Sequence, residues 1–255
     1  MRQGFADFFH QIAADEIEDR LAEVNRTFTA PAVVTGFPDL WSARFPGATV
    51  LPDDEILALQ PQAHDLVIHA LALHWAEDPV GQIVQSARAL REDGLFIGVM
   101  FGGQTLTELR AALAQAEADV TGGLSPRILP MGEIRDLGGL LARAGLALPV
   151  ADLLSQRASY RDIFHLARDL RAMGEGNALA GRLRHPTRRE VLARAGAIMA
   201  THNPDRDDPS RISASFDLVF LTGWAPSDSQ PKPLRPGSAQ ARLADALNAA
   251  RKQDE

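Results

Sequence analysis

The chain has 255 residues, 45% of them hydrophobic and 23% charged, which is the composition of a globular protein with one large domain or one domain with an insertion. Its formal net charge of −7 argues against nucleic acid as the main partner, because phosphate binding needs a basic surface. The chain contains no cysteine, which excludes disulfides, thiol nucleophiles, thiolate zinc sites and iron–sulfur clusters held by its own thiolates.

The N-terminal segment predicts a helix. The apolar residues within 5–25 fall roughly on one stripe, with acids between them. These acids stand where a signal peptide would have an unbroken apolar core, and no segment approaches the roughly 20 apolar residues that cross a bilayer. We expect residues 1–30 to form an N-terminal helix of a cytoplasmic protein, free or peripheral at the inner membrane and not membrane-spanning.

Strand and helix patterns alternate over residues 31–150, which favours an α/β fold with a doubly wound parallel sheet. The strand candidates are 32–36, the run PGATVL, Leu66–His69 and 95–101. A helix over 81–92 is expected to stop at the Asp93–Gly94 turn, and Gly145 stands where the helix over 131–146 would end. Thr105 and Glu108 have the spacing of a capping box, which predicts a helix that begins at Thr105.

The last third of the chain predicts a strand pair with helices between its members. LPVADLL and Phe216–Thr222 read as the strands, and 160–203 as helices rich in arginine, so that 151–224 would form a terminal strand pair with an inserted helical lid. Residues 225–255 predict a proline-rich linker and a short helix with Leu243 and Leu247 on one side. This tail is too poor in apolar residues for a core of its own, so it is either solvated or docked on the domain or a partner.

Five blocks within 65–239, in the same order, resemble one protein family. They are HDLVIHALALHWAEDP, REDGLFIGVMFGGQTLTELR, GGLSPRILPMGEIRDLGGLLARAGLALPV, DLRAMGEGNAL and FLTGWAPSDSQPKPLRPGSA. They are similar to class I S-adenosylmethionine (SAM)-dependent methyltransferases, and most to the methyltransferase-like assembly factors of respiratory complex I. The resemblance implies a Rossmann-like, seven-stranded sheet that ends in an antiparallel hairpin. It also implies SAM as cofactor and a protein subunit of the NADH:quinone oxidoreductase as client; arginine hydroxylation is a reaction proposed in that family.

The first strand departs from the family. Members carry a glycine-rich turn of the LDxGxGxG kind there, whereas VVTGFPDLW matches it only at Gly36. Phe37 adds a ring where the ligand would lie, and Pro38 removes an amide that could hold an anion. Only 32 steps separate Val33 from Asp65, room for one strand–helix–strand unit of about 30 residues where the family fits two. We therefore expect a fold truncated near the second strand, with SAM binding weakened or lost.

The resemblance assigns the remaining cofactor contacts. PDDEILAL is similar to the family segment after the third strand, where an acid faces the adenine amino group, so Asp53 or Asp54 would take that role. Gly36 stands for the glycine-rich turn, and His69 and Leu71, at the end of the buried strand, complete the set of cofactor-binding candidates.

The catalytic candidates are His74 and Trp75. They come just after a buried parallel strand, at the edge where open α/β sheets place ligands. His74 is the candidate for proton transfer because the ordinary pKa of histidine lies near neutrality. The structural alternative is that Trp75 packs on the next helix and His74 caps it.

The substrate or partner candidates come from two segments. The turn Phe101–Gly102–Gly103 ends a strand at the same edge, so it either begins a helix or lets a client backbone approach. Arg168, Arg171, Glu175 and Asn177, in the lid, could pair with an acidic or arginine-bearing protein segment, or they are simply solvated. We expect no metal, because no His-x-Asp or His-x-Glu pair occurs in the sequence.

Three functions remain open from the sequence. The chain could modify a complex I subunit with SAM bound in a degenerate pocket. It could instead be a non-catalytic chaperone that holds the client in the cleft where the family binds its cofactor. It could also methylate a small or carrier-bound substrate, which would require a basic patch for the carrier's phosphopantetheine arm.

Overall fold

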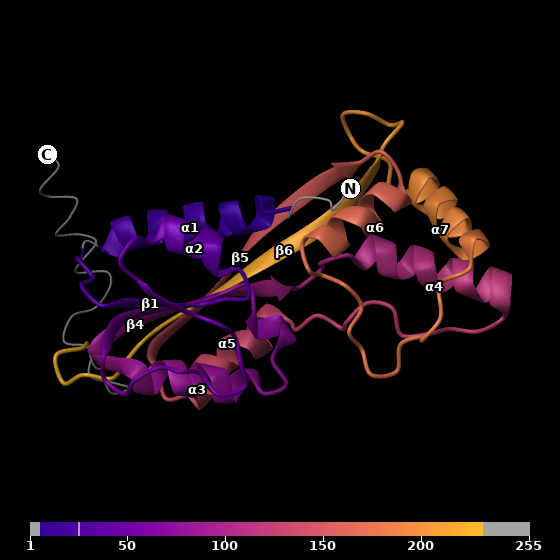
Figure 1. Ribbon diagram of the computed structural model, residues 1–255. Coiled ribbons are helices and arrows are strands. Elements are labelled where there is room, and N and C mark those ends of the chain that lie inside the picture. Colours follow the sequence, from indigo (N-terminus) through magenta and orange to yellow (C-terminus); the bar gives the residue numbers. More distant parts are fainter. Residues whose placement is uncertain (1–5, 25, 232–255) are drawn as a thin grey trace, which may run out of the picture.

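The computed structural model describes residues 6–24 and 26–231, so the short helix expected near the C-terminus lies outside the described residues. A six-stranded sheet runs through the molecule in the order β2-β1-β3-β4-β6-β5 (Figure 1). Its strands are β1 Pro31–Val34, β2 Thr49–Leu51, β3 His64–Ala70, β4 Leu90–Gly102, β5 Ala147–Tyr160 and β6 Ile212–Trp224. The pairs from β2 to β4 are parallel, whereas β6 is antiparallel to both of its neighbours.

Helices cover both faces of this sheet. They are α1 Phe8–Val24, α2 Pro38–Arg44, η1 Leu73–Trp75, α3 Pro79–Ala89, α4 Thr107–Thr121, α5 Ile134–Arg143, α6 Ile163–Ala172 and α7 Arg189–His202. Figure 1 shows α1 and α2 on one face and α3 and α5 on the other. Each face has its own apolar core, and the strands between them carry continuous apolar runs because both of their faces are buried.

The sheet confirms the predicted architecture. The parallel part contains one strand, β2, outside β1 within the described residues, so the sheet is one strand narrower than the family's seven. β5 and β6 form the expected antiparallel hairpin and continue past the end of β4, as far as the pair Tyr160 and Ile212. α6 and α7 connect them and form the predicted lid, which packs on α4 (Figure 1).

Two predicted helix boundaries were wrong. α4 begins at Thr107 rather than Thr105, because the Thr105 hydroxyl donates to Gly102 O and accepts from Asp217 N, while Glu108 accepts from Ser215. Partners on β6 thus occupy both side chains of the supposed capping box. α3 ends at Ala89, before the expected Asp93–Gly94 turn, because Leu90 already pairs with β3. The predicted end of α5 is confirmed: Gly145, at φ +81°, donates to Ala142 O.

Candidate functional site

The candidate site lies at the carboxyl edge of the parallel strands. β1, β3 and β4 run in the same direction, so the segments that follow them emerge at one edge of the sheet. These segments are the turn Thr35–Phe37, the η1 helix, and the residues around Phe101. The chain just after α6, with Gly174 and Glu175, closes over them from the lid.

The turn after β1 offers few amides to a ligand. Thr35 N donates to Leu51 O at 3.0 Å, and Phe37 N donates to the Thr35 hydroxyl at 3.2 Å. Pro38, the first residue of α2, has no amide hydrogen. Gly36 is therefore the residue of this turn whose amide hydrogen can still be donated to a ligand. A methyl group added at Gly36 would lie 3.5 Å from Asp53 Oδ1, so the Asp53 carboxylate stands directly beside it.

An aromatic cluster occupies the space beside this turn. The Phe37 ring lies edge-on to His10 of α1, with ring centroids 4.6 Å apart, and it also approaches Gly174 of the lid. The Trp41 indole donates to His10 Nδ1 at 3.2 Å. Burial, together with the nearby His74, lowers the pKa of His10 to about 4. Because a neutral His10 is an acceptor for Trp41, the ring is held as an uncharged part of the core.

Sequence reasoning missed His10 and Trp41. Ala13, Ala14 and Ile17 follow His10 at helical spacing, and all are buried. This pattern was a signal that His10 lies on the buried face of α1. Its pairing with Trp41 joins segments 31 residues apart, and no local pattern reports such a pairing.

His74, Trp75 and Glu175 form a hydrogen-bonded cluster. Glu175 Oε1 lies 3.0 Å from His74 Nε2 and 3.4 Å from Trp75 Nε1. The His74 side chain is 5% exposed and that of Glu175 17%, whereas Trp75 is 39% exposed. His74 Nδ1 is buried and finds no hydrogen-bond partner among the described residues. The His74 ring also lies edge-on to Phe101 at 5.3 Å, so four sequence candidates meet here.

The cofactor candidates lie on the other side of the turn. His69 is fully buried on β3, and its Nε2 lies 2.7 Å from Gln82 Oε1; burial lowers its pKa to about 4. Gln82 in turn donates to Asp54 O, so His69 supports the loop that carries Asp53 and Asp54. Leu71 is buried at φ +51° and donates to Val99 O. The structure thus brings Gly36 and Asp53 together and places His69 within the core.

The two glycines after Phe101 are close to protein atoms. A methyl group at Gly103, which has φ +54°, would lie 2.5 Å from Asp217 Oδ2, and one at Gly102 would lie 2.7 Å from Val219. Asp217 accepts from Gln104 N and from the Ser155 hydroxyl, both at 2.7 Å. The close approach at this turn is therefore made by β6.

The other lid candidates lie apart from the cluster. Arg168 and Arg171 are exposed on α6, and Arg171 bonds back to Ala167 O of its own helix. Asn177 donates to Pro126 O and ties the lid to the loop after α4. Within the described ranges no group of three or more His, Cys, Asp or Glu residues is arranged to hold a metal, and none of the helices there is long and apolar enough to cross a membrane.

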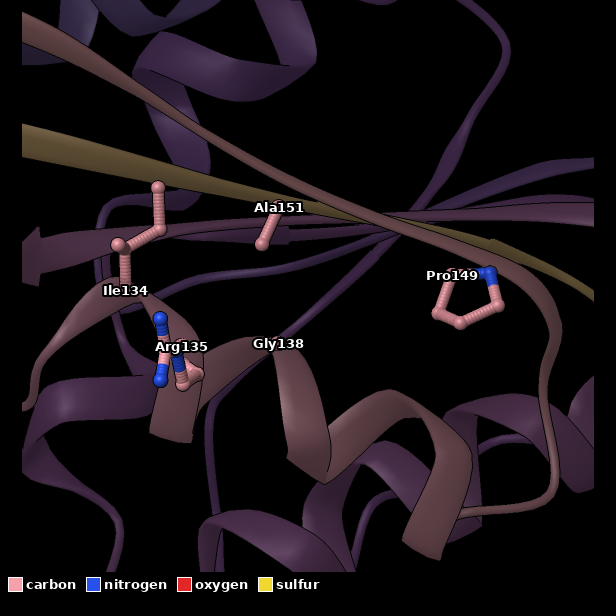
Figure 2. A pocket seen from close by; sticks show the side chains of 5 residues that line it. All are labelled: Ile134, Arg135, Gly138, Pro149 and Ala151. Carbon is pink, nitrogen blue, oxygen red and sulfur yellow. The ribbon is translucent and has the colours of Figure 1, made fainter.

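Three surface hollows lie elsewhere, along β5. One of about 370 Å³ lies between α5 and the start of β5; Figure 2 shows its lining residues, among them Arg135, Gly138 and Pro149. The other two, of about 620 and 330 Å³, lie toward the end of α1. None of them is lined by a candidate residue from the carboxyl edge.

Comparisons with known proteins point to two kinds of relative, and no family model matches the chain. The chain is 34% identical to arginine-hydroxylase NDUFAF5, mitochondrial, of Danio rerio over 87% of its own length and 68% of that protein's. It is also 34% identical to the human protein of that name, over 85% and 62% of the two chains. It spans between 44% and 68% of the length of five NDUFAF5 proteins.

The chain is also similar to a second set of relatives and to solved structures. The malonyl-[acyl-carrier protein] O-methyltransferase of Laribacter hongkongensis is 34% identical over 72% of this chain and 59% of that protein. The YcgJ protein of Bacillus subtilis superimposes with a TM-score of 0.50 at 11% identity, over 84% of this chain and 99% of that one. A putative methyltransferase from Bacillus halodurans gives a TM-score of 0.49 at 11% identity, over 82% and 98%.

Proposed function

Because this chain belongs to the family of methyltransferase-like complex I assembly factors, within the class I methyltransferase superfamily, we propose that it binds an arginine-bearing segment of a complex I subunit during assembly. The segment would dock at the cluster of His74, Trp75 and Glu175. The chain would meet this client in the cytoplasm or at the surface of the inner membrane.

The observation that carries this proposal is the position of the Glu175 carboxylate. Both recorded hydrogen bonds to it use Oε1, which leaves Oε2 to accept from a guanidinium. The carboxylate is held still by His74 and Trp75 and is mostly shielded from water, so a charge-assisted hydrogen bond to it is stronger than at an open surface.

The exposed ring of Trp75 favours an arginine rather than a lysine as the client residue that binds here. Its ring is 39% exposed beside the carboxylate. A planar guanidinium can stack on an indole face while its N–H groups reach a carboxylate, and a lysine ammonium does this less well. A client arginine would therefore contact both side chains at once.

We further propose that SAM is bound weakly or not at all, because the residues after β1 do not fit this group. Two of the three amides of the turn are already used, and Pro38 supplies none. The Asp53 carboxylate stands at the one glycine, where it would repel the carboxylate of the cofactor's methionine part. The Phe37 ring, which contacts His10 and approaches Gly174 of the lid, fills space next to this turn.

Chemical modification of the bound arginine is the second candidate, and His74 favours it. Its Nε2 faces a carboxylate, so in the neutral ring Nε2 carries the hydrogen and the buried Nδ1 is an acceptor without a partner. Because Nδ1 is buried, the chain after α6 would have to move away before this nitrogen could take a proton from a client group. Methylation of a carrier-bound substrate is the weaker alternative, because it needs SAM at the turn described above.

The test uses the indole N–H signal of Trp75 in a nitrogen–proton NMR spectrum. The chain has three tryptophans, so Trp75→Phe identifies the signal by its loss. The peptide Gly-Arg-Gly should shift this signal in a saturable way, and Gly-Lys-Gly should shift it much less.

Glu175→Gln is the decisive variant, because it keeps the shape of the side chain and an acceptor for His74 but removes the charge. It should weaken the peptide-dependent shift about tenfold or more, as expected for the loss of a shielded charge-assisted bond. Equal shifts with both peptides, or an unchanged titration in Glu175→Gln, would reject the arginine site.

A further inference from the structure

β5 is a free edge of the sheet with apolar side chains on its surface. Among the described strands it pairs only with β6. Leu148, Val150 and Leu153 are 43%, 53% and 42% exposed. An edge strand with unpaired backbone groups and exposed apolar residues is a docking surface unless another segment covers it.

The two hollows toward α1 together form a groove at this edge. The larger hollow is lined by Val24, Leu148, Trp224 and Pro231, among others, and the smaller one by Val24 and Val150 above the floor residues of β4. Because both are lined by Val24, they lie next to each other at the end of α1. We call this the α1/β5 groove. Its walls combine apolar side chains with polar ones such as Arg26 and Gln230, and Thr222 Oγ1, which lines it, is buried without a partner among the described residues.

The described chain ends in this groove. Gln230 Nε2 donates to Asp93 Oδ1 at 3.0 Å and to Ala225 O at 2.8 Å, which fixes the exit of the chain beside Trp224. Pro231 itself lines the larger hollow. The sequence continues for 24 residues, 232–255, beyond this point.

We propose that residues 232–255 of this chain cover the α1/β5 groove. The lining residues of β5, from Leu148 to Val150, span about 7 Å, and 24 residues span about 36 Å even when helical, so the segment reaches all of the groove. It carries Leu234, Leu243 and Leu247 for the apolar walls. Its base Lys232 comes directly after Pro231, and Glu23 lines the smaller hollow, whereas Asp93 of the larger hollow is already paired with Arg26.

Site-directed cross-linking tests this proposal cleanly, because the chain has no cysteine of its own. The full-length double variant Val150→Cys/Leu243→Cys, treated with a short bismaleimide at low concentration, should form a cross-link within one molecule. The matched control is Leu124→Cys/Leu243→Cys. Leu124 is 72% exposed and follows α4, which ends at the opposite end of the molecule from the end of α1 (Figure 1), so this pair should cross-link poorly.

A second measurement keeps the test independent of the cross-linker. Val150→Asp places a charge in the groove and should make trypsin cleavage after Arg242 and Arg251 about tenfold faster, whereas Leu124→Asp should not. Cross-links between two molecules would instead assign the groove to a second copy. The absence of a cross-link, together with equal cleavage in both Asp variants, would overturn the proposal and leave the groove to another partner.

Discussion

His10 and His69 make the stability of this protein depend on pH. Burial lowers both pKa values from 6.5 to about 4. Between these values the unfolded chain binds more protons than the folded one, so the free energy of unfolding is highest above pH 6.5 and falls as the pH decreases toward 4. For each histidine the loss between pH 7 and pH 5 should be about 2 kcal/mol.

Urea unfolding at a series of pH values measures this loss. His10→Asn keeps an acceptor for the Trp41 indole but cannot take up a proton, so its stability should fall less steeply between pH 7 and pH 5. His185→Asn, at an exposed histidine, should keep the steep dependence of the parent chain. A slope for His10→Asn that equals that of the parent would contradict the prediction.

Gly103 is a position where a single methyl group should be costly. Its φ of +54° disfavours a side chain, and a methyl group there would lie 2.5 Å from Asp217 Oδ2. Gly122 also has a positive φ, +73°, but open space around it. Gly122→Ala should therefore cost about 1 kcal/mol, and Gly103→Ala about 2 kcal/mol more. Equal urea midpoints for the two variants would show that Asp217 moves aside freely.

At the scale of elements, Glu175 fastens the lid to the sheet. Its bonds to His74 and Trp75 hold the chain after α6 against η1. Glu175→Ala removes them, and loss of a shielded hydrogen bond of 1–2 kcal/mol should make trypsin cleavage at Arg182, Arg184 and Arg188 about tenfold faster. The exposed Glu92, near the start of β4 and so at the other end of that strand from the candidate site, provides the control: Glu92→Ala should leave the cleavage pattern of the lid unchanged.

The strands could be predicted where burial on both faces leaves a continuous apolar run. Leu66–His69 lies within β3 and 95–101 within β4 for this reason. The second half of β5 could not, because Ser155, Gln156 and Arg157 alternate on a free edge and carry no apolar pattern. That half is a strand because it pairs with β6. The pairing cannot be predicted from the local sequence, because β6 is distant along the chain.

The residues of the candidate site were recognisable one by one, but their arrangement was not. His74 and Trp75 could be placed at the carboxyl edge because they follow a buried parallel strand. Glu175 lies 101 residues after His74, and only the closure of the lid brings the two together. The predicted capping box was wrong for the same reason. Residues of β6 are the partners of Thr105 and Glu108, and the local spacing of these two residues does not reveal such distant partners.

At the scale of the whole molecule, the changes around the old cofactor site reinforce one another. The narrowed sheet leaves one strand outside β1, and the loop after that strand brings Asp53 against Gly36. α1 contributes His10 to the aromatic cluster, and the lid contributes Gly174 beside Phe37. Three separate parts of the chain therefore change the space beside β1. α1 and the lid help to fill it, and the loop after β2 brings a negative charge to it.

Because these changes act together, Phe37→Gly alone should not restore SAM binding. The variant opens space for a ligand, but Pro38 still has no amide hydrogen and the Asp53 carboxylate still stands at Gly36. Calorimetric titration with SAM and with its demethylated product should give no heat for the parent chain or for Phe37→Gly at millimolar ligand. Phe37→Gly/Asp53→Asn, which also removes the charge, is the matched comparison and should bind more tightly than the single variant. Submillimolar binding by Phe37→Gly alone would mean that the ring is the sole obstacle and that the anion-binding turn is otherwise intact.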